Sequence, residues 1–143
     1  MTRLLTRLSE SSPTTLSAGL LVLRAWFGLL LALGHGLGKF SDLSTFSAKV
    51  ADQGIPLAGV LGPAAAASEL VGGLLFAFGL LTRPAAVFVL VTMLVAAVVV
   101  HANDPFSKKE FALAYGMAAL AVLIAGPGKF SLDARLFAAS PKT

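Results

Sequence analysis

Long apolar runs separated by short polar segments dominate the chain. The runs cover about residues 16–37, 57–81, 84–101 and 110–126. They are rich in glycine, alanine and leucine and show no strict apolar–polar alternation, which favours helices over strands. About 20 apolar residues in a helix cross the hydrocarbon core of a bilayer, and a helix satisfies its own backbone hydrogen bonds there. The pattern therefore predicts an all-α integral membrane protein, a bundle of four spanning helices.

The polar segment between the first two runs carries a weaker helical signal. Leu43, Phe46 and Val50 recur at helical spacing within residues 41–53. We predict a short amphipathic interfacial helix that lies on the membrane surface. No linker, repeat or low-complexity tract indicates a second domain, so residues 1–143 are expected to form a single membrane domain.

Composition supports the membrane assignment and excludes several kinds of chemistry. Hydrophobic residues make up 57% of the 143 residues and charged residues 13%, about half of what a soluble domain carries. The net charge of +4 comes from basic residues scattered between apolar runs, which indicates membrane anchoring and no nucleic-acid partner. The absence of cysteine excludes disulfides, thiol chemistry and iron–sulfur clusters formed by the chain's own residues. A redox role would need a bound cofactor or a partner protein.

The N-terminus resembles a signal peptide only in part. Arg3 and Arg7 precede the first run, but that run is long, contains Arg24 and lacks a small-x-small cleavage site, so we expect a retained first span. With four spans, six basic residues outside them fall on the side of the termini and four on the other side, which favours cytoplasmic termini. The six are Arg3, Arg7, Arg83, Lys129, Arg135 and Lys142, and the four are Lys39, Lys49, Lys108 and Lys109.

Two charged residues interrupt the first two runs. Arg24 lies in the first and Glu69 near the middle of the second, so antiparallel helices would place both at mid-depth. An unpaired charge there costs at least about 2.5–3.5 kcal/mol. We therefore predict that both side chains face inward and pair directly or meet through water, either to fix the helix register or to serve a function.

A polar seam is predicted to lead from this pair to one membrane face. Arg24 and His35 are separated by about three helical turns, and Lys39 follows one turn later on the same stripe. Small residues on the facing stripe would allow the two helices to approach closely. That facing stripe comprises Gly62, Ala65, Glu69, Gly73 and Phe76.

Further polar residues converge on the same face. His101 ends the third run and Glu110 begins the fourth, where Tyr115 could donate a hydrogen bond to an internal ligand. The alternatives are interfacial caps for the histidines, membrane anchors for the lysines and simple packing for Tyr115. No metal site and no catalytic residue is assigned. The candidate pocket residues are Arg24, His35, Lys39, Glu69, His101, Glu110 and Tyr115.

Three short motifs carry a family resemblance. They are H-G-x-x-K at 35–39, E-x-x-G-G followed by G-L-x-T-R within 69–83, and G-x-G-x-x-S-L-D at 126–133. Their order and spacing resemble the DoxX family of small four-helix bacterial membrane proteins, over nearly the whole chain apart from its ends. The resemblance marks His35, Lys39, Glu69, Arg83, His101 and Glu110 as motif positions.

The resemblance implies a place in membrane redox chemistry. The family is named after a membrane subunit of a thiosulfate-oxidising, quinone-reducing system, and other members are linked to membrane oxidoreductase complexes. We therefore expect a multi-pass protein of the bacterial inner membrane that handles a quinone or another small lipophilic molecule. Redox-enzyme subunits or further copies of the chain are the expected partners, and no intrinsic cofactor is expected. A small transporter or proton-conducting component, and a non-catalytic membrane adaptor, are the alternatives.

Overall fold

The computed structural model describes residues 12–137, and these residues form helices and connecting segments without strands. Arg3, Arg7 and Lys142, which entered the prediction of orientation, lie outside the described residues. The elements in chain order are α2 (Pro13–Leu31), η1 (Ala32–Gly36), α3 (Leu37–Ser41), α4 (Leu43–Asp52), α5 (Ala58–Ala67), η2 (Ser68–Gly72), α6 (Gly73–Phe78), α7 (Thr82–Val95), η3 (Ala96–Val100), α8 (Phe106–Ala125) and α9 (Leu132–Leu136).

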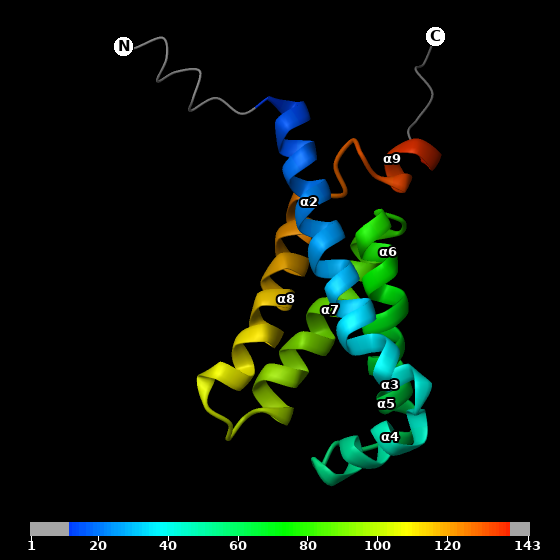
Figure 1. Cartoon of the computed structure of the whole chain (residues 1–143), viewed down its shortest axis with the longest axis vertical. Coiled ribbons are helices and arrows are strands. Elements are labelled where there is room, and N and C mark those ends of the chain that lie inside the picture. The colour runs from blue at the N-terminus through cyan, green and yellow to red at the C-terminus, as the bar shows by residue number, and fades with distance from the viewer. Residues whose placement is uncertain (1–11, 138–143) are drawn as a thin grey trace.

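Within the described residues, three continuous helices are long and apolar enough to cross a membrane. They are Pro13–Ser41, Ala58–Phe78 and Thr82–Val100, which confirms the first three predicted spans. The helix α8 has 20 residues and carries three charged side chains in its first turns. It begins four residues earlier than predicted and packs along α7. Figure 1 shows these long helices side by side as a bundle.

Each of the three spans contains a π-helical segment, namely η1, η2 and η3. In η3, for example, the His101 amide donates to the Ala96 carbonyl at 2.9 Å, five residues back. Such segments widen a helix locally and recur at functional sites. The sequence patterns gave no indication of them.

Small residues bring the first two spans together. The span α2 packs against α6, and η1 packs against η2. A Cβ atom at Gly36 would overlap the backbone of Leu70, and a Cβ at Gly28 would lie 2.6 Å from the carbonyl oxygen of Gly73. Only glycine permits this spacing, as the predicted stripe of small residues requires.

The predicted amphipathic helix is confirmed as α4. Asp42 caps its N-terminus by accepting a 3.1 Å hydrogen bond from the Thr45 amide. Hydrogen bonds from the Thr45 side chain and backbone, together with Ser44, hold the pKa of Asp42 below its usual value. Val50 is buried, and α4 packs against α5 at one end of the bundle. The start of α2 and the helix α9 lie at the opposite end (Figure 1).

Candidate functional site

The most buried acidic side chain of the described spans, Glu69, is ion-paired. The Nζ atom of Lys39 lies 2.5 Å from Oε1 and 2.6 Å from Oε2 of Glu69. Glu69 is only 2% exposed, whereas 33% of the Lys39 side chain is exposed. The same ammonium lies 5.2 Å from the ring centroid of Phe46 in α4, within range of a cation–π contact. The pair therefore joins the end of the first span, the middle of the second and the interfacial helix.

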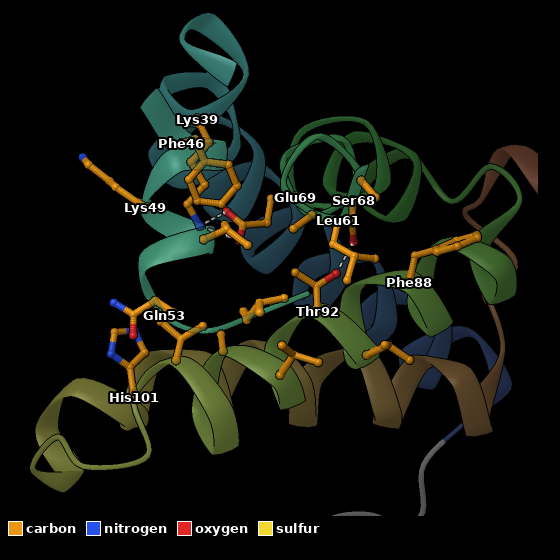
Figure 2. Close-up of a pocket in the computed structure, with 18 residues that line it drawn as sticks. Lys39, Phe46, Lys49, Gln53, Leu61, Ser68, Glu69, Phe88, Thr92 and His101 are labelled. Carbon is orange, nitrogen blue, oxygen red and sulfur yellow. Dashed lines mark hydrogen bonds and ion pairs between the residues drawn. The ribbon is translucent and has the colours of Figure 1, made fainter. Parts of the chain in front are cut away.

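A cavity of about 560 Å³ lies beside this pair. Figure 2 shows Lys39 and Glu69 linked on its wall, with Ser68 and Thr92 deeper along it and His101 at one end. The Thr92 hydroxyl donates to Ser68 Oγ at 2.9 Å. Lys49 of α4 and Gln53 at the end of that helix also line the cavity, and the rest of the wall is apolar. The apolar lining consists of Phe46, Val50, Ile55, Leu61, Ala64, Ala65, Phe88, Val91, Val95, Ala96 and Val100.

The predicted pairing of Arg24 with Glu69 is wrong. Arg24 is fully buried, but its guanidinium donates to the carbonyl oxygens of Ala77 (3.3 Å) and Phe130. Its Nε has no hydrogen-bond partner within the described residues. Arg24 thus holds the C-terminal segment against the end of α6, while Lys39 takes the place beside Glu69.

Helix stagger explains this difference. Gly62 in α5 packs against Ser47 of α4, so the second span extends past the end of the first and α4 covers the overhang. Glu69, in the middle of its own helix, therefore lies opposite Gly36 near the end of the first span. Arg24 lies twelve residues before Gly36, a distance of about 18 Å along the helix.

The other predicted pocket residues divide into two groups. His101 lines the cavity, and its Nδ1 lies 2.7 Å from Asp104 Oδ2. His35 does not line it and instead contacts the ring of the buried Tyr115 edge-on, with 5.6 Å between centroids. Tyr115 also contacts Phe27 edge-on, so its ring has a packing role. Glu110 is exposed and makes no side-chain hydrogen bond to any other described residue.

The metal-ligand candidates do not cluster. Across residues 12–137, no three histidine or acidic side chains lie close enough to hold a metal ion. The polar groups that line the cavity are two ammonium groups, one carboxylate, two hydroxyls, one amide and one imidazole.

A comparison with protein families identifies the fold. The DoxX family model matches residues 19–102, well over half of the chain. The chain belongs to the DoxX family. It is a multi-pass integral membrane protein. No curated protein and no solved structure gave a match.

The matched region of this DoxX protein contains the complete ion pair. Lys39 ends the H-G-x-x-K motif, and Glu69 begins the E-x-x-G-G motif. Sequence reasoning placed both in the pocket without pairing them. It missed Ser68 and Thr92, whose hydroxyls are common in membrane helices and gave no pattern. Gly36, packed against Leu70, was the available signal that the two motifs are neighbours.

The G-L-x-T-R part of the second motif and the third motif bind each other at the opposite end of the bundle. Asp133 accepts hydrogen bonds from the Leu81 amide (2.7 Å), the Thr82 amide (2.9 Å) and the Thr82 hydroxyl (2.6 Å). Burial alone would raise the pKa of Asp133, but the hydrogen bonds from Thr82 and Leu81 and the charge of Arg24 outweigh it and hold the pKa below its usual value. We call this set of contacts the C-terminal latch.

Proposed function

We propose that this DoxX protein is the membrane subunit of an oxidoreductase system and holds a quinone, or another small lipophilic molecule, in the cavity beside Lys39 and Glu69. The observation that carries the proposal is a buried, ion-paired carboxylate on the wall of a largely apolar cavity. Small-molecule sites have volumes of about 300–1,000 Å³ and combine apolar walls with a few polar groups. Ionisable groups inside a membrane segment are costly and usually functional.

The polar groups match the chemistry of a quinone. Its two carbonyl oxygens accept hydrogen bonds. The donors on the cavity wall are the Lys39 ammonium and the Ser68 hydroxyl, which accepts a hydrogen bond from Thr92 and keeps its own proton to donate. Reduction to the quinol takes up two electrons and two protons. His101 and Glu69 can exchange protons at this site. The electrons would come from a redox partner protein. The chain has no cysteine and therefore no thiol or iron–sulfur centre of its own to supply them.

The geometry favours a binding site over a conduit. A transporter or proton channel would need a polar path along the bundle. The close Gly28–Gly73 contact lies between buried Arg24 and the cavity beside Glu69 and leaves no such path between them. A non-catalytic adaptor would use only the surface of the bundle, to dock its partner, and would not need the cavity. Substitutions in the cavity that leave the turnover of a copurified redox partner intact would favour the adaptor.

Ligand-dependent stability tests the proposal. The purified protein in nanodiscs is heated with and without a quinone, and lipid extracts of the native membrane preparation are analysed by mass spectrometry. We expect the quinone to raise the thermal midpoint of the wild type, since a ligand at 100 times its Kd adds about 2.7 kcal/mol. Glu69→Gln and Thr92→Val should reduce this rise, whereas Lys108→Gln, an exposed position away from the cavity, should not. No rise in the wild type and no quinone in the extract would refute the proposal.

A further inference from the structure

The cavity is elongated, and its polarity changes along its length. It follows the third span, α7 and η3, from Phe88 to the C-terminal cap at His101, thirteen residues or about 20 Å of helix. In Figure 2, Lys39, Glu69 and His101 lie toward one end and Phe88 lies at the other, beyond Thr92. A ligand that fills this space would therefore have a polar part and an apolar part.

The apolar part of the cavity is open at the side of the bundle. Leu61, Phe88 and Val91 line the cavity, yet they are 44%, 66% and 54% exposed. Side chains that are both lining and exposed form the mouth of a cavity. Leu61 belongs to α5 and the other two to α7, and both helices are parts of membrane spans. The mouth between α5 and α7 therefore faces acyl chains and not water.

We infer that the ligand is an amphiphile with a long apolar tail, which reaches the cavity from the bilayer and keeps its tail in the opening between α5 and α7. This inference rests on the proposed function and narrows it to tailed quinones, such as those with an isoprenoid chain, as opposed to short water-soluble ones. The polar head lies at the Lys39–Glu69 pair, and the tail passes Val91 and Phe88 into the lipid.

The tail needs space at the cavity mouth but contributes little to the free energy of binding. Lipid tails are as apolar as the helix surface, so moving the tail from bilayer to cavity yields little hydrophobic free energy. A bulky side chain at the mouth should therefore discriminate between ligands that have the tail and ligands that lack it. Val91→Trp places an indole at this mouth.

The experiment compares two quinones with the same ring, one with an isoprenoid tail and one with a methyl group in its place. Binding to protein in nanodiscs is measured against the quinone concentration in the bilayer, in moles of quinone per mole of lipid. This removes the difference in how strongly the two quinones partition into the bilayer. Val91→Trp should weaken binding of the tailed quinone at least about tenfold and leave the tail-less quinone unchanged. Val87→Trp is the matched control, since Val87 is exposed on the same helix but does not line the cavity.

The outcomes separate this inference from the proposed function. If Val91→Trp weakens both quinones equally, or neither, the tail does not pass between α5 and α7, although the proposed function stands. If the wild type binds neither quinone, the proposed function itself fails. The thermal midpoint without ligand checks that Val91→Trp is folded, and Val91→Phe replaces it if that midpoint falls.

Discussion

Gly28 packs backbone to backbone against Gly73. A Cβ atom at Gly28 would lie 2.6 Å from the Gly73 carbonyl oxygen, and one at Gly73 would lie 2.9 Å from the Gly28 carbonyl oxygen. This contact fixes the stagger of the first two spans. It places Arg24 beside Ala77, where the guanidinium binds a carbonyl, and keeps it several turns from Glu69. One glycine pair thus decides that the two buried charges belong to separate clusters.

The Gly28 contact should be sensitive to a single methyl group. Gly28→Ala forces the two helices apart and should lower the free energy of unfolding by about 1–3 kcal/mol. Unfolding by SDS in mixed micelles, followed by circular dichroism, measures the change. Gly19→Ala is the control, because a Cβ at Gly19 meets nothing within 4 Å, and alanine there should be neutral or stabilising by up to about 1 kcal/mol. Equal effects of both variants would contradict the close contact.

The ion pair should show strong coupling. Lys39→Met leaves the buried Glu69 carboxylate without its charge partner and should cost about 1–3 kcal/mol, the penalty for an unsatisfied buried group. Glu69→Gln in the same background should recover much of this loss, since an amide is less costly to bury than an isolated charge. A double-mutant cycle on unfolding free energies measures the coupling. Additive effects would mean that the two side chains do not interact.

The spans were predictable from the sequence, but their stagger was not. Run length and apolar content identified each span to within about four residues. The buried positions of Gly62, Glu69, Gly73 and Phe76 follow from helical periodicity. Depth in the membrane, however, was judged from the midpoint of each run. The midpoints of the first two runs do not lie at the same depth, because α4 covers an overhanging turn of α5. This is a tertiary contact that no local pattern encodes.

The candidate site was predictable to a similar extent. The sequence placed Lys39 and His101 at one membrane face and Glu69 deeper on the same polar seam, because charge and helix direction suffice for that. It gave no partner for Asp133, because this carboxylate binds the backbone amides of Leu81 and Thr82, and an amide is present at almost every residue. The π-helical segments were equally inaccessible, since they depend on how neighbouring helices pack.

The C-terminal latch should weaken in acid. The pKa of Asp133 is below its usual value in the folded protein, so in the window between the two values the unfolded chain binds more protons and stability rises with pH. The contribution of Asp133 is thus complete above the unfolded value of about 3.9 and is lost as the pH falls through the lower folded value.

Asp133→Asn tests this pH dependence. Unfolding free energies of the wild type and Asp133→Asn are compared from pH 6 down to pH 2. The wild type should be more stable by a constant amount above about pH 4, and the difference should shrink below that. Asp52→Asn, an exposed position in α4, controls for the loss of a surface charge. A difference that persists unchanged to pH 2 would mean that the contribution of Asp133 to stability does not depend on the ionisation of its carboxylate.

Gly79 offers the sharpest test of where Arg24 lies. Gly79 has a φ of +69°, and a Cβ there would lie 2.7 Å from Arg24 Cζ. Gly54 has a similar φ of +74° with open space around it. Gly54→Ala should therefore cost only the backbone strain of about 1 kcal/mol. Gly79→Ala should cost about 1–3 kcal/mol more, because it also displaces the buried guanidinium. Unfolding in mixed micelles gives both values, and equal losses would show that Arg24 does not pack on Gly79.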